Sequence, residues 1–321
     1  MTALAARSLG YDIHVLDPDP ECAARPVADI AITAEFEDSA AAAELARGCA
    51  VVTLEIEKVS LASLHAAALY APVRPGEHVL AIVQDRARQK DWLTSHGFPV
   101  GPYRTARSAA EMRDGLASLG KSYAKRCTGG YDGRGQMILA APDDVTRAWR
   151  ALGEAACVLE RALDLEAELS VMVARRPSGE MAVYPPARNH HEDGILDWSV
   201  IPGSFPPGIG ARATKIARGI AEQLGVEGLI AIELFLTLDG ELLVNELAPR
   251  PHNSFHSTER ACVTSQFEQH ARAVCDLPLG ATEVVRPAAI INLLGDLWAD
   301  GQTLPFDEAL KLPGVRLHLY G

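Results

Sequence analysis

Residues 229–250, LIAIELFLTLDGELLVNELAPR, restrict the possible folds more than any other stretch of this chain. Two apolar runs typical of β-strands flank Asp239-Gly240, a dipeptide that favours a tight hairpin turn. If these two residues form the loop, the antiparallel register places Glu233 directly opposite Glu246. The segment therefore predicts a hairpin that carries two facing carboxylates.

The like charges of the two facing glutamates require compensation. Directly opposed β-carbons lie roughly 4.5–5.5 Å apart, and like charges at that spacing are destabilising. A divalent cation would compensate them, and Mg²⁺ suits carboxylate oxygens that are combined with substrate phosphates and water. One alternative stays open, in which both side chains point to solvent on an edge hairpin. The first interpretation predicts a magnesium site at Glu233 and Glu246.

The N-terminal residues are typical of a parallel α/β layer. Helices are expected over 1–10 and 39–47, and strands over 13–16, within 29–38 and within 49–59. Such a layer normally opens with a strand and a glycine-rich turn, whereas this sequence opens with the helix. We therefore expect residues 1–76 to form an incomplete Rossmann-like domain.

The rest of the chain is expected to form further units. A length of 321 residues exceeds one ordinary core, since domains usually contain roughly 100–200 residues. The connector PVRPGEH (72–78) marks the first boundary. We expect a linker helix with a small α/β subdomain over 77–155, a larger α/β unit over 156–275 and a short β-rich C-terminal domain over 276–321.

Composition excludes several classes of function. The net charge of -12 disfavours a general nucleic-acid binder, because such proteins neutralise phosphates with Lys and Arg. No apolar run approaches the roughly 18 residues of a membrane helix, so no membrane partner and a cytoplasmic location are expected. The six cysteines lack C-x-x-C spacing and are expected to be reduced packing residues.

Residues 125–136, KRCTGGYDGRGQ, contain four glycines. A nest of backbone N–H groups can cradle phosphate oxygens, and Lys125 adds a charge. A plain turn would use the same residues, and no Walker A pattern is present. Glu160 and Glu168 follow on later strand-like runs. A lysine, a glycine lid, an acidic hinge and paired carboxylates in this order are the parts of an ATP-grasp fold.

Several motifs carry a resemblance that covers almost the whole chain. GGYDGRGQ, NELAPRPHNS, TSQFEQHARAV and INLLGD resemble signatures of the 5-(carboxyamino)imidazole ribonucleotide synthases, ATP-grasp enzymes of purine biosynthesis. HVLDPDP, QDRARQK, NHHEDGIL and LPGVRLHLYG are also similar. The resemblance implies that ATP, bicarbonate and 5-aminoimidazole ribonucleotide are converted to the N-carboxylated product, ADP and phosphate, through carboxyphosphate. It also implies Mg²⁺, and commonly a homodimer.

The resemblance implies which residues contact ATP, with the lid closing over its phosphates, Glu160–Leu163 as the adenine hinge and Glu168 at the ribose. For His191 the alternative is a solvated loop histidine. The implied ATP contacts are Arg86, Lys125, Gly130, Tyr131, Asp132, Gly133, Arg134, Gly135, Gln136, Glu160, Arg161, Ala162, Leu163, Glu168, His191, Asn245 and Glu246.

A second set is implied for the other two substrates. Arg250, His252 and Asn253 match the family's bicarbonate and amine pocket, where Arg250 can pair with a carboxylate as a planar fork. Phe255 stands where the family usually has glycine, and a ring there is expected to narrow the pocket. The residues implied for the ribonucleotide are Tyr131, Asp132, Arg134, Ser254, Lys311 and Arg316.

The ends of the sequence depart from the family pattern. The leading strand with its glycine-rich turn and the basic C-terminal tail, which both approach the ribonucleotide phosphate in the family, are not found, so a truncated chain is expected. Two alternatives to the carboxylating ligase therefore remain. One is a nucleotide-binding fragment without turnover, and the other is a formate-using ATP-grasp relative.

Overall fold

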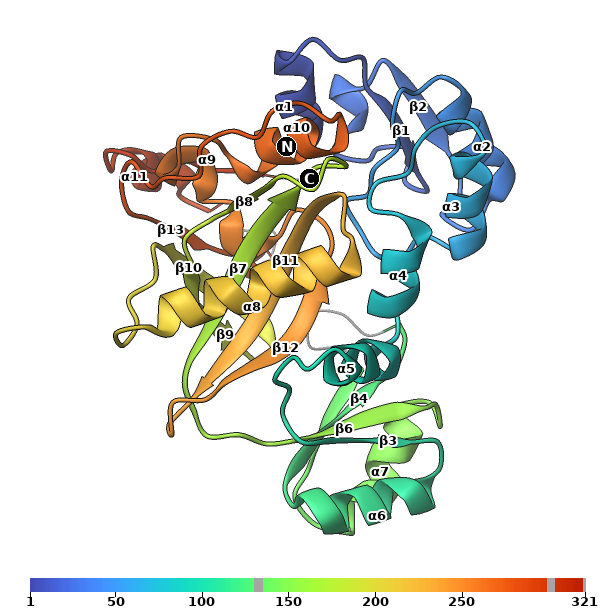
Figure 1. Ribbon diagram of the computed structural model, residues 1–321, viewed down its shortest axis with the longest axis vertical. Helices are drawn as coiled ribbons and strands as arrows, with labels where there is room; N and C mark the ends of the chain where they lie inside the picture. Colours follow the sequence, from blue (N-terminus) through green and yellow to red (C-terminus); the bar gives the residue numbers. More distant parts are fainter. Residues whose placement is uncertain (130–134, 299–303, 320–321) are drawn as a thin grey trace.

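The computed structural model describes residues 1–129, 135–298 and 304–319. Within these residues the strands form three sheets, of two, four and seven strands. Figure 1 shows the largest sheet at the centre, the N-terminal unit beside one end of it and the small sheet below. Residues 1–83, 276–298 and 304–319 lie around the central sheet.

The N-terminal unit is built on a parallel pair of strands, as the sequence predicted. The side chain of Asp38 accepts from two backbone amides at the start of the following helix, and Ser60 caps the next helix in the same way. The elements are α1 Thr2–Ser8, β1 His14–Asp17, η1 Arg25–Val27, β2 Ile30–Thr33, α2 Ser39–Arg47, α3 Leu61–Ala68 and α4 Glu77–Val83.

The prediction of a strand within 49–59 is wrong. The described residues of this segment make one parallel bridge, between Val52 and Val73. Val52 donates to Pro72 O at 2.9 Å and accepts from Arg74 N at 2.9 Å, so its backbone is paired with the 72–74 connector. Glu57 of the same segment instead lies against Arg250, with 2.8 Å between Oε2 and Nε.

The small sheet is antiparallel and follows α5 Arg86–Ser95. Its strand order is β3-β6-β4-β5, and α6 and α7 cover one face around buried Met112, Leu116 and Leu159. Because β6 pairs with β3 and β4, the sheet extends beyond the expected limit at residue 155. Its elements are β3 Tyr103–Ala106, α6 Ala109–Leu119, β4 Ser122–Arg126, β5 Gln136–Leu139, α7 Asp144–Ala151 and β6 Cys157–Arg161.

The large sheet has the order β12-β11-β7-β9-β10-β13, with β8 paired to β7. Its neighbouring strands are antiparallel. The expected β-rich C-terminal unit is wrong for the described residues, because its strand β13 belongs to this sheet. The elements are β7 Leu165–Arg175, β8 Met181–Val183, β9 Ala187–Glu192, β10 Ile195–Ile201, α8 Ile209–Leu224, β11 Gly228–Thr237, β12 Leu242–Ala248, η2 Asn253–Phe255, α9 Thr258–Ala261, α10 Gln266–Val274, β13 Ala288–Ile291, η3 Gly295–Trp298 and α11 Phe306–Leu310.

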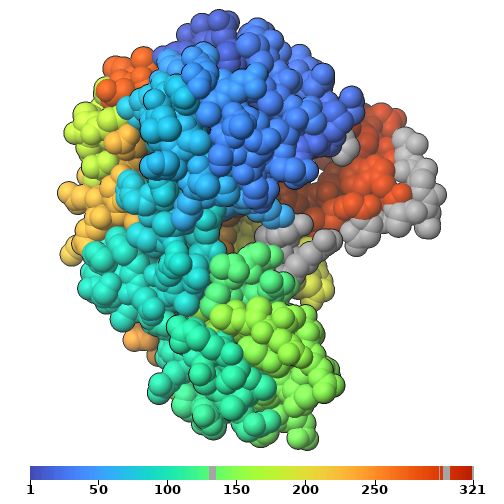
Figure 2. Space-filling view, turned by 90° about the vertical axis from the view of Figure 1, so that its right-hand side faces the viewer, coloured from blue at the N-terminus to red at the C-terminus, as the bar shows by residue number. Residues whose placement is uncertain are grey.

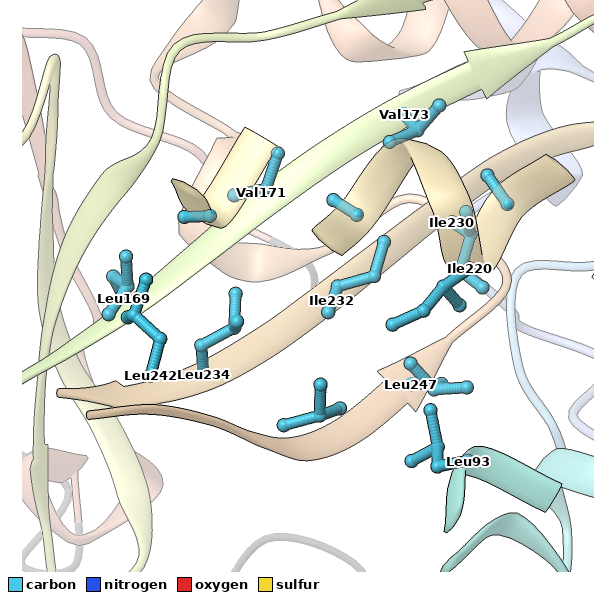
Figure 3. Close-up of a cluster of buried hydrophobic side chains, with 14 of the residues drawn as sticks. Leu93, Leu169, Val171, Val173, Ile220, Ile230, Ile232, Leu234, Leu242 and Leu247 are labelled. Atoms are coloured by element: carbon cyan, nitrogen blue, oxygen red, sulfur yellow. The ribbon is translucent and has the colours of Figure 1, made fainter. Parts of the chain in front are cut away.

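Helix α8 crosses one face of the large sheet and closes the main core (Figures 1 and 3). Its buried side chains recur at the three- and four-residue spacing of an amphipathic helix. Figure 3 shows Ile220 of α8 beside Ile230 of β11, with Leu93 of α5 near Leu247 of β12. Helix α5 is thereby packed against the hairpin, which fixes where its polar side chains point.

A second cluster lies on the other side of this sheet. Phe255 belongs to it, is fully buried and packs on Tyr184 with 6.0 Å between ring centroids. Phe255 is not among the described residues that line the cleft. The expectation that this ring narrows the substrate pocket is therefore wrong, because the ring points into the core.

The β11–β12 hairpin places Glu233 opposite Glu246, as predicted, but by a different route. Thr237 faces Glu241, so the loop is Leu238-Asp239-Gly240, with Gly240 at φ +83°. This loop is one residue longer than expected, and by itself it would place Asn245 opposite Glu233. A β-bulge at Asn245 adds one residue to β12 and thereby brings Glu246 opposite Glu233.

Candidate active site

A large cleft runs between the N-terminal unit, the small sheet and the large sheet. Its volume is about 2940 Å³, far larger than the pocket of one small ligand. Figure 2 shows the molecule hollowed between the blue N-terminal residues, the red C-terminal residues and the green small subdomain. Cleft walls from three units are suited to more than one substrate.

The facing carboxylates lie in this cleft. Glu233 Oε1 is 3.2 Å from His252 Nε2, and Asn245 Nδ2 donates to Glu233 Oε2 at 3.2 Å. Burial alone would raise the pKa of Glu233, but the hydrogen bond and charge of His252 outweigh it and lower that pKa to about 2. Arg86 Nη2 donates to Glu246 Oε1 at 3.2 Å. Glu233 is thus ionised, and both carboxylates face hydrogen-bond donors in the cleft rather than bulk solvent alone.

Two lysines hold the carboxylate of Glu160 beside this pair. Lys125 Nζ lies 3.4 Å from Glu160 Oε1 and Lys90 Nζ lies 3.3 Å from Oε2. Burial works to raise the pKa of Glu160, yet Lys125 and Lys90 lower it to about 2. Lys90 Nζ also donates to Asn245 O at 3.0 Å. The expected ATP lysine and the acidic hinge therefore meet through their side chains.

Lys90 is a residue that our sequence reasoning missed. It is buried on α5, one helical turn after Arg86, and burial lowers the pKa of its ammonium group. The i, i+4 spacing within QDRARQK places both cations on one face of a helix, which is the signal that could have identified it. Glu57, the partner of Arg250, was missed because it lies far away in the sequence.

Glu168 and His191 form a second ionisable pair on β7 and β9. His191 Nδ1 contacts Glu168 Oε2, and both side chains line the cleft. Burial acts to lower the pKa of His191, but the hydrogen bond to Glu168 and the charge of Glu233 raise it overall. The alternative of a solvated loop histidine is therefore wrong.

The expected adenine hinge lies between the two sheets. Glu160, Arg161 and Leu163 line the cleft, whereas Ala162 does not. The backbone amides of Arg161 and Ala162 donate to Pro102 O at 3.0 Å and Lys121 O at 2.9 Å. Those two amides are already used within the fold, so they do not read a base.

The lid segment is only partly described. Gly130, Tyr131, Asp132, Gly133 and Arg134 lie outside the described residues. Gly135 O accepts from Arg126 N at 2.9 Å, and Gln136 opens β5 and lines the cleft.

The expected bicarbonate residues meet at the carboxylate pair. His252 and Asn253 line the cleft next to Arg250, and Gln266 holds the His252 backbone through bonds of 2.9 Å to both N and O. Ser254 is fully buried, with its hydroxyl 2.8 Å from His252 Nδ1. Its expected contact with a substrate is replaced by a contact with His252 beneath the cleft surface.

The two C-terminal cations differ in position. Arg316 lines the cleft. Lys311 follows α11, lies outside the described lining and forms an ion pair with Glu308. The expectation that both approach one phosphate is thus supported by position for Arg316 only. His256, Arg260 and Arg286 also line this end of the cleft and were not predicted.

Two features are absent from residues 1–129, 135–298 and 304–319. No group of three or more His, Cys, Asp or Glu side chains there is arranged to hold a metal ion, so Glu233 and Glu246 stand as a pair. Over the same residues, no helix is both long and apolar enough to cross a membrane.

Comparison with known proteins identifies the family. Residues 91–267 match the ATP-grasp domain, and residues 1–84 match the ribonucleotide synthetase pre-ATP-grasp domain. The N5-carboxyaminoimidazole ribonucleotide synthase of Bacillus subtilis (strain 168) is 39% identical over 322 residues, covering 100% of this chain and 84% of that protein.

Superposition on solved structures leads to the same family. An ADP complex of N5-carboxyaminoimidazole ribonucleotide synthetase superposes with a TM-score of 0.93 at 40% identity, over 100% of this chain and 84% of that one. The N5-carboxyaminoimidazole synthase of Aspergillus clavatus, in complex with ADP and 5-aminoimidazole ribonucleotide, superposes with a TM-score of 0.86 at 29% identity, over 92% and 79%. The resemblance found in the sequence motifs is confirmed, and the chain belongs to the N5-carboxyaminoimidazole ribonucleotide synthase family, with an ATP-grasp fold preceded by a pre-ATP-grasp domain.

Proposed function

We propose that the protein carboxylates 5-aminoimidazole ribonucleotide with bicarbonate in purine biosynthesis, converting ATP to ADP and phosphate. The observation that carries this proposal is the position of the Glu233–Glu246 pair. It has the cations Arg86, Lys90 and Lys125 on one side. His252 and Arg250 lie on the other side, in the same cleft. A phosphoryl donor and a small anion can therefore meet at one carboxylate pair.

The cation side is proposed to hold the ATP phosphates. Lys125 and Arg86 are the cleft-lining cations that can approach phosphate oxygens, and Glu160 holds Lys125 in place at 3.4 Å. Lys90 supports the same arrangement through its own ion pair with Glu160. Glu168 and His191, further along the cleft, are proposed to bind the ribose end.

The donor set of Glu233 and Glu246 fits Mg²⁺. Both side chains present oxygens to the cleft, and the low pKa of Glu233 keeps it ionised at neutral pH. Mg²⁺ is usually bound through one or two carboxylates, with phosphates and water completing its shell, so a pair is sufficient. When bound, the ion would neutralise charge on the transferring phosphoryl group.

The anion side is proposed to bind bicarbonate. Arg250 offers a planar fork of donors, and Glu57 fixes its Nε at 2.8 Å. Phosphorylation of bicarbonate by ATP gives a mixed anhydride and ADP. The exocyclic amine of the ribonucleotide then bonds to the carboxyl carbon as the C–O bond to phosphate breaks, releasing phosphate and a proton. Arg250, His252 and Asn253 line the cleft beside the carboxylate pair and orient the anion there.

Residues 1–76 are proposed to be a Rossmann-like unit, supported by the parallel β1–β2 pair with α2 packed on β1. A homodimer is proposed from the family resemblance, and sedimentation equilibrium would test it by giving about twice the 34.3 kDa chain mass.

Coupled ADP release tests the proposed reaction. We expect ADP only when Mg-ATP, bicarbonate and 5-aminoimidazole ribonucleotide are all present, and we expect Glu246→Gln to lower kcat at least roughly a hundredfold, the usual scale for losing one transition-state charge partner. ADP release with formate and glycinamide ribonucleotide would instead support the formate-using relative. Calorimetric Mg-ATP binding without any ADP release would support the fragment without turnover.

A further inference from the structure

The segment that carries the proposed anion-binding side chains has little backbone pairing of its own. It covers residues 250–253, between the end of β12 and η2. Among the described residues, its backbone–backbone hydrogen bonds reach only close neighbours in the sequence. Arg250 N donates to Ala248 O at 2.9 Å, and His252 O accepts from Phe255 N at 3.0 Å. Such local bonds do not determine where the segment lies relative to the large sheet.

The side chain of Gln266 joins this segment to a distant part of the chain. Gln266 is the first residue of α10 and is fully buried. Its Oε1 accepts from His252 N at 2.9 Å, and its Nε2 donates to His252 O at 2.9 Å. A backbone N–H only donates and a carbonyl only accepts, so the two partners fix the orientation of the amide. We call this pair of bonds the Gln266 clamp.

The Gln266 clamp has the hydrogen-bond pattern of a β-ladder. His252 has extended backbone angles, φ −128° and ψ 141°. In an antiparallel ladder, two facing residues exchange both of their N–H···O bonds, and here the Gln266 carboxamide takes the place of the second strand. The side chain of an extended residue stands roughly perpendicular to that plane. The imidazole is thereby turned into the cleft, where Nε2 lies 3.2 Å from Glu233 Oε1.

Gln266 is itself held in place. Gln266 N donates to Thr258 Oγ1 at 3.0 Å, and the side chain of Ser265 caps α10. Helix α10 packs on β7 and β11 of the large sheet. The clamp therefore ties residues 250–253 to the same sheet that carries Glu233.

We propose that Gln266 is a positioning residue that fixes residues 250–253 beside the carboxylate pair. The side chains of Arg250, His252 and Asn253 then present their donors to one anion, a role that rests on the proposed carboxylation with bicarbonate. Gln266 is not among the described residues that line the cleft, so it acts through the His252 backbone and touches no substrate. ATP is proposed to bind on the other side of the pair, so its binding should not depend on the clamp.

Gln269 offers a matched control on the same helix. It is also fully buried, its Oε1 accepts from Gly280 N at 2.7 Å, and its Nε2 donates to Gly280 O at 2.8 Å. The bonds have the same pattern, but Gly280 is not among the described residues that line the cleft. Gln266→Met and Gln269→Met each remove two such bonds and keep most of the side-chain volume, so their losses of stability should be similar.

Amide exchange tests the clamp without turnover. The chain has ten histidines, so labelling with ¹⁵N-histidine gives a small set of backbone amide signals, and His252→Gln identifies the signal of His252. We expect this amide to be protected from exchange in the wild type. In Gln266→Met it should exchange at least roughly tenfold faster, the equivalent of one hydrogen bond. Gln269→Met should leave its rate unchanged.

Steady-state kinetics test the positioning role. Gln266→Met is expected to lower kcat/KM for bicarbonate by at least roughly tenfold, because the anion-binding side chains lose a fixed position worth about one hydrogen bond. KM for ATP should stay at the wild-type value. Gln269→Met should change neither quantity, and urea unfolding of both variants shows whether their stability losses match.

The outcomes separate the two proposals. If the wild-type protein releases no ADP, the carboxylation proposal fails, while exchange of the His252 amide still decides whether the clamp forms. If the enzyme turns over and Gln266→Met keeps the wild-type kcat/KM for bicarbonate, or Gln269→Met loses as much, the positioning role is refuted. An unprotected His252 amide in the wild type would overturn the clamp even if Gln266→Met failed to fold.

Discussion

Glu160 shows how much of this site depends on single side chains. Its carboxylate lies between Lys90 and Lys125, and these two ammonium groups hold its pKa near 2 although burial opposes them. A buried charge is tolerated only when it is paired and hydrogen-bonded. The three residues therefore act as one unit, in which Lys90 is the most deeply buried member.

Replacing Lys90 tests this unit. Lys90→Met removes one of the two cations and leaves the Glu160 carboxylate and Asn245 O short of a donor. We expect the free energy of unfolding to fall by about 2 kcal/mol, and KM for ATP to rise because Lys125 loses its fixed position. Urea denaturation and steady-state kinetics measure the two effects.

Arg88→Met is the control for Lys90, because Arg88 is exposed on the same helix. Its effect on unfolding should stay within about 0.5 kcal/mol. Equal losses for the two variants would show that Lys90 contributes no more than an exposed helix cation.

At the scale of elements, the β11–β12 hairpin determines the chemistry. The three-residue loop and the bulge at Asn245 offset each other, so that Glu233 faces Glu246. The bulge also directs the side-chain amide of Asn245 toward Glu233 and the backbone carbonyl of Asn245 toward Lys90. Bulges beside active sites commonly redirect side chains in this way.

Deleting Asn245 should be more damaging than truncating it. The deletion converts the bulge into a regular ladder in which Glu246 still faces Glu233, but it also removes the Asn245 backbone carbonyl that accepts from Lys90, so we expect a larger loss of ADP release than for Asn245→Ala. Asn245→Ala keeps the register and removes two contacts, of 3.2 and 3.4 Å, so we expect a loss of roughly tenfold in kcat.

The matching control inserts one glycine after Asp239 in the exposed turn. Longer surface loops cost little, so unfolding should change by less than about 1 kcal/mol and activity should be retained. Equal activity in the Asn245 deletion and in Asn245→Ala would contradict the role assigned to the bulge.

At the scale of the whole molecule, side chains join the N-terminal unit to the large sheet. Arg74 Nε pairs with Glu227 Oε2 at 2.8 Å, and Thr53 Oγ1 lies 2.8 Å from His270 Nε2. His270 is fully buried on α10, and burial lowers its pKa to about 4. The junction is thus built for a neutral imidazole.

This junction predicts acid sensitivity. The unfolded chain binds a proton at His270 near pH 6.5, but the folded chain does so only near pH 4. Stability from this group is therefore present above pH about 6.5 and is lost as the pH falls toward 4, by on the order of 3 kcal/mol. Unfolding free energies measured across that range should show the decline.

His270→Gln keeps a polar contact with Thr53 but does not titrate. Its stability should vary less than that of the wild type between pH 6.5 and 4, by roughly the amount given above. His65→Gln, at an exposed position on α3, serves as the control and should leave the pH dependence unchanged. Identical pH profiles for wild type and His270→Gln would exclude this source of acid sensitivity.

The sequence by itself determined the order of the functional parts and the hairpin that carries Glu233 and Glu246. Those features are local, because a hairpin register depends on neighbouring residues and a helix face on i, i+4 spacing. The parallel β1–β2 pair was predictable for the same reason. The strand expected within 49–59 did not form, because a strand requires a pairing partner and a short apolar run does not identify one.

Only the tertiary structure decided the contacts between distant segments. It paired Glu57 with Arg250 and Lys90 with Glu160, turned Phe255 into the core, and buried Ser254 under His252. In the cleft these pairs set which groups are charged, since desolvation and nearby charges control pKa values. Motifs in the sequence were enough to recognise the chemistry. Local patterns carry no information on which distant side chains meet, and the geometry of the site therefore comes from the fold alone.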